Sequence, residues 1–202
     1  MTAGRLCYPV FITFILTLPY GCGFPEHFKQ NLQESSESYN APEQLSGDPK
    51  DTGILLVDAF KKIAFNEMLL SGVAVVDTSG LQKPITYGSF RRGGFLSQIS
   101  GVVVIPNLRP GTYRIVKIKT ENVNVWETLP LPITEEFEVE VRAGEPTYFG
   151  RIHVKQPFAS PQREITIQYD KNREAESWKM VADKYSDSPW TTIIAKRIAV
   201  LK

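Results

Sequence analysis

Short apolar or alternating runs recur along the chain from Gly53 onward, and turn residues separate them. The runs are residues 54–60, 69–76, 101–105, 112–118, 137–141, 147–154 and 165–169. In the clearest run, alternation places Phe137, Val139 and Val141 on one face and two glutamates on the other. No long helical crossover separates the runs, which favours antiparallel pairing. The pattern predicts a mainly β fold, an antiparallel β-sandwich of about seven strands.

Two of the turns carry predictions of their own. Residues 143–146, Ala-Gly-Glu-Pro, predict that the strands on either side of them form a hairpin. Pro110 and Gly111 separate another pair of runs. Proline fixes φ and glycine tolerates positive φ, so this pair favours a tight reversal of the chain.

The pattern changes near the C-terminal end of the chain. Apolar residues recur there at helical spacing, and they are Ala175, Trp178, Val181, Ala182 and Tyr185. This spacing predicts a C-terminal amphipathic helix over residues 173–185, which the proline of Ser188-Pro189 would end. Residues 190–200 predict a second, short helical element.

The N-terminal 21 residues have the order of a signal peptide. Arg5 precedes a short apolar run, and Pro-Tyr-Gly then breaks that run before Cys22. The run is shorter than the roughly 20 apolar residues that a spanning helix needs. Cys22 stands where a bacterial lipoprotein carries its lipid anchor. Two alternatives stay open: ordinary cleavage after Gly23, which would discard Cys22, and a segment that is never cleaved.

The division into segments follows from this order. Residues 1–21 are the predicted signal peptide, and residues 22–52 are polar and poor in β-branched residues, which predicts a lipidated flexible tether. A tether of this length has a root-mean-square span of roughly 30 Å. Residues 53–202 are sufficient for one β-sandwich domain with a C-terminal helical segment. Gly23 stands where an aspartate would favour retention in the inner membrane, so we expect an extracytoplasmic protein anchored to the outer membrane.

Composition excludes several classes of protein. Removal of residues 1–21 takes away only Arg5 among the charged residues and leaves basic and acidic residues equal in number. Nucleic-acid binding normally needs a basic excess on one face, so we expect no nucleic-acid partner. The chain has two cysteines, Cys7 and Cys22, and the first lies in the predicted signal peptide. An internal disulfide is therefore not expected.

One segment resembles a known family. Residues 102–115 read Val-Val-Val-Ile-Pro-Asn-Leu-Arg-Pro-Gly-Thr-Tyr-Arg-Ile, a strand, a Pro-Gly turn and a strand that begins with Tyr113. This resembles the Leu-x-Pro-Gly-Thr-Tyr segment of carboxypeptidase regulatory-like and transthyretin-like (prealbumin-like) β-sandwiches. Residues 148–152, Tyr-Phe-Gly-Arg-Ile, resemble a strand of bacterial envelope lipoproteins that carry such a domain. The resemblance covers residues 53–169 and implies an accessory module, with no particular function.

Candidate chemistry is sparse. His153 is the only histidine of the predicted domain, so a metal site built from several imidazoles is not expected, and His153 is interpreted as a strand surface residue. The domain has no cysteine and no Gly-x-Ser-x-Gly motif, so we expect neither an enzyme nor a bound cofactor. Trp126, followed by two prolines at 130 and 132, is the candidate contact for a ligand or partner. The alternative for Trp126 is local packing.

These observations lead to one functional hypothesis and one alternative. The hypothesis is a lipoprotein held to a membrane by its lipid anchor, whose domain is a non-catalytic binding or structural module of the cell envelope and contacts another envelope protein. The alternative is a secreted or periplasmic protein that binds a carbohydrate or small ligand.

Overall fold

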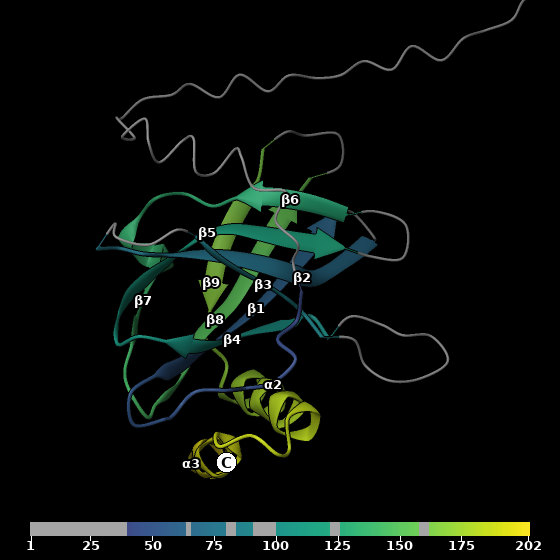
Figure 1. Ribbon diagram of the computed structural model, residues 1–202. Helices are drawn as coiled ribbons and strands as arrows, with labels where there is room; N and C mark the ends of the chain where they lie inside the picture. Colours follow the sequence, from purple (N-terminus) through teal and green to yellow (C-terminus); the bar gives the residue numbers. More distant parts are fainter. Residues whose placement is uncertain (1–39, 64–65, 80–83, 91–99, 122–125, 158–161) are drawn as a thin grey trace, which may run out of the picture.

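The computed structural model describes residues 40–63, 66–79, 84–90, 100–121, 126–157 and 162–202 (Figure 1). These residues form nine strands, one 3-10 turn (η1, Glu135–Phe137) and two α-helices, α2 (Lys171–Lys184) and α3 (Thr191–Leu201). The strands are β1 (Gly53–Ile63), β2 (Asn66–Asp77), β3 (Ile85–Gly88), β4 (Val102–Leu108), β5 (Gly111–Glu121), β6 (Trp126–Pro130), β7 (Glu138–Val141), β8 (Pro146–Gln156) and β9 (Glu164–Gln168). The prediction of a mainly β fold with C-terminal helices is confirmed.

All nine strands belong to one curled, mixed sheet. Its strand order is β6-β5-β2-β1-β8-β9, with β3 beside β2, β4 beside β1 and β7 beside β5. Every pair among the described strands is antiparallel except β1 and β8, which run parallel from Ile54 opposite Pro146 to Ile63 opposite Gln156. The expectation of purely antiparallel pairing is wrong at this one pair.

The predicted hairpin across residues 143–146 is also wrong. β7 pairs with β5, whereas β8 pairs with β1 and β9. The connection crosses β1 at its start, where Gly144 N–H donates to the Thr52 carbonyl at 3.0 Å. This crossing needs Gly53, because a Cβ atom there would lie 2.4 Å from Val141 Cγ1.

The Pro-Gly turn joins β4 to β5, and these two strands do not pair with each other. β4 lies beside β1, and β5 lies beside β2, β6 and β7. Gly111 does not adopt a positive φ. The residue with positive φ near this turn is Asn107, at 58°. Tyr113 Oη donates to the Arg109 carbonyl at 2.9 Å and ties the second strand to the turn.

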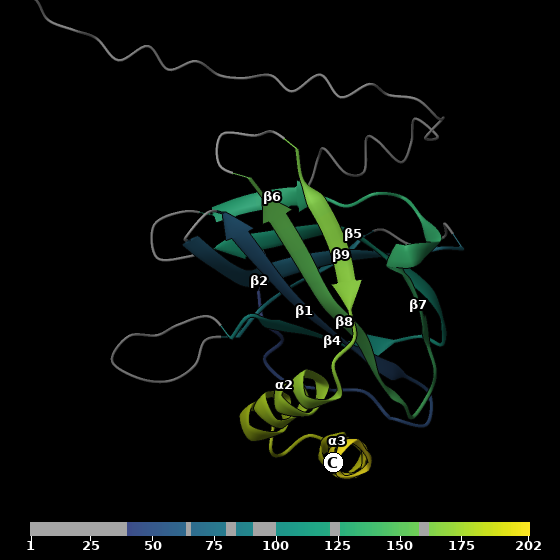
Figure 2. The same ribbon diagram turned by 180° about the vertical axis from the view of Figure 1, so that it is seen from behind.

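Two apolar cores lie on opposite faces of β1. The inner core, within the curl of the sheet, includes Leu55, Val57, Leu70, Val73, Ile115, Ile118, Ile152 and Val154. The helix-side core, between the sheet and the two helices, includes Leu45, Ile54, Leu56, Val104, Trp178, Val181, Trp190 and Ile194. Figure 2 shows both helices at one end of the molecule, beside the starts of β1 and β8. The predicted apolar helical face is confirmed, because Trp178, Val181 and Tyr185 are buried.

Residues 40–52 lie against the domain. Leu45 is buried in the helix-side core, Tyr185 Oη donates to the Pro42 carbonyl at 2.9 Å, and Ser188 Oγ donates to the Leu45 carbonyl at 2.9 Å. Residues 40–52 are therefore packed against the domain, although the sequence predicts that they belong to a flexible tether. They are packed because Leu45 fills a site that the helices create. Residues 1–39, with the predicted signal peptide and the rest of the tether, lie outside the described residues.

Candidate functional site

The outer face of β1, β8 and β9 continues beyond the part that the helices cover (Figure 2). Cross-strand register brings five side chains together there, and they are Asp58, Phe60, Arg151, His153 and Thr166. We call this group the outer strip. Asp58 stands opposite Arg151, Phe60 opposite His153, and His153 opposite Thr166.

A β-bulge directs Arg151 to this face. The register between β1 and β8 shifts between Leu56 and Asp58, so that the step from Tyr148 to Arg151 on β8 matches two residues on β1. Simple alternation would turn Arg151 inward, and a bulge re-aims the side chains that follow it. Gly150 occupies the bulge with φ 108°, and a Cβ atom there would lie 3.1 Å from the Gln168 carbonyl oxygen. Glycine is therefore required at this position.

Phe60 of β1 contacts both Arg151 and His153 of the neighbouring strand β8. The Arg151 guanidinium carbon is 5.0 Å from the centre of the Phe60 ring, within the range of a cation–π contact. The His153 ring meets Phe60 edge to face, with 5.9 Å between the ring centres. Phe60 and His153 are half-buried, and the Arg151 side chain is 27% exposed. Arg151 is thus held in place while part of it still reaches solvent.

Asp58 is the buried charge behind the strip. Its side chain is 1% exposed, and its Oδ2 accepts from Arg173 Nε at 2.6 Å and lies 3.5 Å from Arg151 Nε. Its Oδ1 has no hydrogen-bond partner among the described residues, and the same holds for Arg151 Nε and for the hydroxyl of Tyr148. Arg173 is therefore the principal partner of Asp58, and the charge of Arg151 is only partly compensated.

The first turn of α2 places Arg173 over the sheet. Asp170 caps this helix, and its Oδ1 accepts from Asn172 N–H at 2.8 Å and from Arg173 N–H at 3.3 Å. A cation near a helix N-terminus is unfavourable for the helix dipole, so Arg173 gains its stability from Asp58. Although burial opposes it, the bond to Asp58 keeps the pKa of Arg173 above its ordinary value.

Burial also acts on the titratable groups around the strip. Burial, followed by the nearby charge of Arg151, lowers the pKa of His153 below its ordinary value. His153 is therefore a neutral imidazole at neutral pH and can both donate and accept a hydrogen bond. Burial and the charge of Asp58 raise the pKa of Tyr148, so its hydroxyl stays protonated.

Glu174 is a second buried carboxylate and joins the helices to the sheet. Its Oε1 accepts from Arg197 Nε of α3 at 2.7 Å and from Trp178 Nε1 at 3.3 Å. Its Oε2 accepts from the Tyr169 hydroxyl at 2.5 Å, in the link between β9 and α2. Hydrogen bonding to Glu174 raises the pKa of both Arg197 and Tyr169. This group fixes the helices beside the outer strip.

A third charged group lies around the end of β1 and consists of Lys61, Glu127 and Arg163. Lys61 at the end of β1 is fully buried and forms an ion pair with Glu127 of β6, which also accepts from Arg163 Nη2 at 2.5 Å. Beside this group, at the ends of β8 and β9, lies a cleft of 460 Å³ whose lining includes Lys62 and Lys155. Lys155 forms an ion pair with Glu164 at 3.8 Å and Arg163 pairs with Glu127, so two of the three cations that line the cleft have acidic partners.

The residues singled out from sequence are only partly placed. Cys22 lies outside the described residues. Trp126 begins β6 opposite Glu121, but its side chain also lies outside the described part of the structure, so its contact role stays a prediction. His153 lies on the outer face of β8, half-buried, as its interpretation as a strand surface residue requires.

Sequence reasoning missed Asp58, Arg151 and Arg173. The signal for Asp58 was a single carboxylate inside the apolar run Leu-Leu-Val-Asp-Ala-Phe, since an isolated charge at a buried strand position needs a partner. Its partner, Arg173, lies 115 residues further along the chain, so no local pattern connects the two. Among the described residues, no group of three His, Cys, Asp or Glu side chains is arranged to hold a metal ion. No helix in the described part of the chain is long and apolar enough to cross a bilayer.

Comparison with known proteins gives no family. Neither a scan against protein-family models nor a search of curated proteins finds a match. Among solved structures, the chain is similar to the dioxygenase domain of a dioxygenase carbohydrate-binding protein fusion from Streptomyces sp. SirexAA-E, with 13% identity over 67% of this chain and 90% of that one and a TM-score of 0.23. It is also similar to wild-type pneumolysin, with 14% identity over 59% of this chain and 24% of that one and a TM-score of 0.22. Likenesses this weak carry no argument about fold or function.

Proposed function

We propose that this chain is a lipid-anchored, extracytoplasmic binding module of a bacterial envelope, without catalytic activity, and that its ligand lies on the outer strip. The orientation of Arg151 is the observation that carries the proposal. Phe60 supports its guanidinium at 5.0 Å, and Asp58 behind it is bonded mainly to Arg173. An arginine held in this way is ready to bind an oxyanion at little cost in side-chain entropy.

The chemistry of the strip favours a ligand that carries a carboxylate or another oxyanion. Arg151 supplies positive charge, and the neutral imidazole of His153 supplies a hydrogen-bond donor beside it. Thr166, on the next strand, adds a hydroxyl on the same face. Acidic glycans and acidic peptides both offer such groups, and an envelope protein would present the second kind. The shared chemistry is the oxyanion.

Thermal unfolding with added ligands tests this proposal. The chain from Cys22 onward is heated alone, with acidic and neutral oligosaccharides, and with acidic and neutral peptides. A ligand at a hundred times its Kd stabilises the folded state by about 2.7 kcal/mol, which is roughly 5–10 °C for a domain of this size. We expect this shift with one acidic class and its loss in Arg151→Gln.

The matched control is Arg142→Gln. Arg142 is 61% exposed, lies between β7 and β8, and bonds to Glu140 away from the outer strip. The Arg142→Gln substitution removes the same charge from the protein without changing the proposed site. The rise in melting temperature on adding the ligand should therefore persist in this variant. A ligand that stabilises Arg151→Gln as well as the unchanged protein, or neutral ligands that match acidic ones, would refute the oxyanion site.

The anchor is a separate part of the proposal, with its own test. A signal-like order of residues before Cys22 supports it. The native protein should exceed the mass of the polypeptide from Cys22 by a diacylglycerol and an acyl chain. An unmodified N-terminus at Phe24 would eliminate the anchor and favour a secreted protein, while leaving the outer strip untouched.

The fold proposed with this function is a sandwich of the kind found in carboxypeptidase regulatory-like and transthyretin-like domains. One layer would be β2, β3, β5, β6 and β7, and the other β1, β4, β8 and β9. The inner core supports this division, because Val73 and Ile118 of the first layer pack with Val57 and Ile152 of the second. Two layers around one core would leave the outer strip on the surface of the second layer.

A further inference from the structure

Helix α3 has an exposed face that is unusual for a helix in water. Its inner side is apolar and packed, with Trp190, Ile194 and Leu201 buried in the helix-side core. The side that faces outward carries Thr192, Ala195, Lys196, Ala199 and Val200, all exposed. The solvent side of a surface helix usually carries charged and long polar residues. Here the outward face is short, largely apolar and bears one lysine.

Val200 is the most exposed large apolar side chain in the described part of the structure, at 75%. Ile193 and Ile198 lie on the two flanks of α3, are half-buried and pack against the helix-side core. Ala195, Ala199 and Val200 therefore supply the exposed apolar surface of the helix, and Lys196 lies one turn before Val200 on the same side. This surface is small, and the charges and the chain beside it are what indicate its partner.

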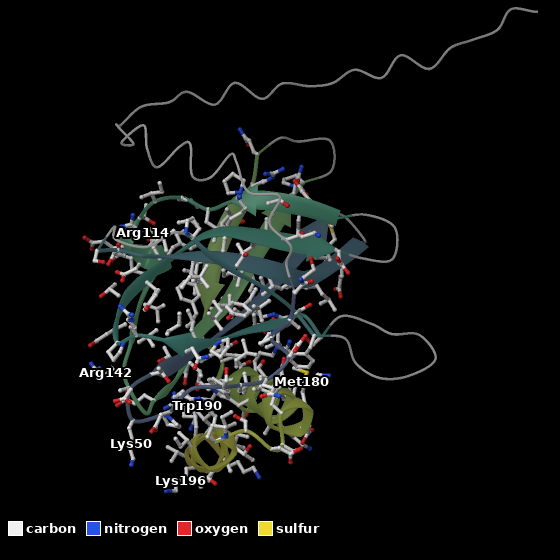
Figure 3. The ribbon with its side chains drawn as sticks, in the orientation of Figure 1. Lys50, Arg114, Arg142, Met180, Trp190 and Lys196 are labelled. Atoms are coloured by element: carbon white, nitrogen blue, oxygen red, sulfur yellow. The ribbon has the colours of Figure 1, made fainter. Side chains whose placement is uncertain are left out.

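The charge of this segment has one sign. Residues 188–202 contain no aspartate or glutamate, and they carry Lys196, Arg197 and Lys202. Arg197 is bonded to Glu174 on the inner side, whereas Lys196 and Lys202 are exposed. Figure 3 shows Lys196 at the outer end of the molecule, beyond α3, with Trp190 between the helices and the sheet. Basic residues beside exposed apolar ones are typical of helices that lie on anionic lipid surfaces.

The described N-terminal end of the chain lies beside these helices. Residues 40–45 run along the connection between α2 and α3 and are held there by Tyr185 and Ser188. Seventeen residues lie between Cys22 and Asn40, and this stretch fully extended reaches about 60 Å. An anchor at Cys22 would therefore allow α3 to reach the same membrane, and tethering raises the effective concentration of a weak contact to roughly the millimolar range.

We infer that the exposed face of α3 docks on an anionic lipid surface, with Val200 entering the interface and Lys196 and Lys202 beside the headgroups. Its 11 residues are too short to span a bilayer, so the helix lies in the plane of the membrane. The contact is separate from the outer strip. It fixes which end of the domain faces the membrane and leaves the strip accessible on the side.

Photocrosslinking to vesicles tests the inference. Cys22 is the only cysteine from residue 22 onward, so a maleimide-bearing lipid couples the chain to the vesicle at that point. The vesicles contain phosphatidylcholine, a minor fraction of phosphatidylglycerol, and a phospholipid with a photoreactive acyl chain, and mass spectrometry locates the adducts. We expect adducts concentrated in residues 192–202. Because the coupling is chemical, the result does not depend on whether the native protein is lipidated.

Two variants make the test specific. Val200→Asp replaces an apolar contact by a charge that anionic lipid repels, and the α3 adducts should fall about tenfold. Ile133→Asp is the matched control, because Ile133 is also exposed, at 38%, and follows β6 at the other end of the molecule (Figure 1). It should leave the adducts unchanged. Both sites are exposed, so neither variant should lower the melting temperature.

Four outcomes would overturn the inference. Adducts spread evenly over the surface would mean that α3 has no preferred contact with lipid. Adducts that survive Val200→Asp would exclude the exposed face of α3 as the contact. Equal adducts on vesicles of phosphatidylcholine alone would exclude anionic lipid as the partner, and an absence of α3 adducts would leave the face to a protein.

Discussion

The ion pair between Asp58 and Arg173 makes the sharpest prediction about stability, because its two partners are buried to different degrees. The Asp58 side chain is 1% exposed, whereas that of Arg173 is 20% exposed and has Glu176 at 3.5 Å as a second partner. Breaking a buried pair is costly mainly through the charge that stays buried without compensation. Loss of Arg173 should therefore cost more than loss of the charge on Asp58.

The magnitudes follow from this asymmetry. Arg173→Met leaves Asp58 with only Arg151 at 3.5 Å, and the free energy of unfolding should fall by about 3 kcal/mol. Asp58→Asn keeps one acceptor oxygen and leaves an arginine that can reach solvent, and it should cost about 2 kcal/mol. The double variant buries no charge at this point and should cost about 3 kcal/mol. The coupling free energy between the two sites is then about 2 kcal/mol.

Urea unfolding followed by far-ultraviolet circular dichroism measures all three variants. With a slope near 2 kcal/mol per molar urea, Arg173→Met should lower the midpoint by about 1.5 M. The exposed pair Arg142–Glu140, at 2.8 Å with both side chains 61% exposed, is the internal control, and the costs of its two single variants should add without measurable coupling. If the costs of Asp58→Asn and Arg173→Met simply add, the pair does not hold α2 on the sheet.

Three further predictions concern the rest of the fold. Gly53→Ala should destabilise the protein by more than about 2 kcal/mol, because its Cβ would meet Val141 at 2.4 Å, whereas Gly111→Ala, with no neighbour closer than 4.0 Å, should be nearly neutral in the same urea titration. Burial raises the pKa of Tyr185 to about 12, so the stability that its protonated form supplies is lost as the pH rises above 10, and denaturation at pH 8 and pH 11 should show a weaker loss in Tyr185→Phe. Trp126 of β6 lies outside the outer strip and is a second, separate predicted contact; Trp126→Ala should weaken capture of an envelope partner without lowering the melting temperature, and equal loss of both would refute a dedicated contact.

The strands that the sequence predicts are those whose apolar pattern is complete within the strand. β3 and β6 are missed because they are short, and their sequences, Ile-Thr-Tyr-Gly and Trp-Glu-Thr-Leu-Pro, do not alternate cleanly between apolar and polar residues. β6 is stabilised by its contact with β5, because Leu129 lies opposite Ile118 and is buried in the inner core. A strand that depends on tertiary contacts leaves little signal in a single sequence.

Pairing partners were harder to predict than strands. A turn with glycine and proline between two strands normally favours a hairpin. At residues 143–146 that rule fails, because β8 pairs with an edge of β1 while β7 pairs with β5. β1 is apolar on both faces, with Leu55 and Val57 inside and Ile54 and Leu56 towards the helices. Runs of this kind mark a central strand. That signal was present in the sequence, but it does not tell which strands lie on either side.

The candidate site depends on the helices without being part of them, and this decides which variants are informative. Arg173 of α2 is the closer ion-pair partner of Asp58, and this leaves Arg151 available to a ligand. A variant that detaches α2 would turn Asp58 towards Arg151 and weaken binding without any contact to the ligand. Loss of binding in Arg173→Met therefore does not identify a contact residue. Arg151→Gln does, because Asp58 keeps its stronger partner and the helix-side core is left intact.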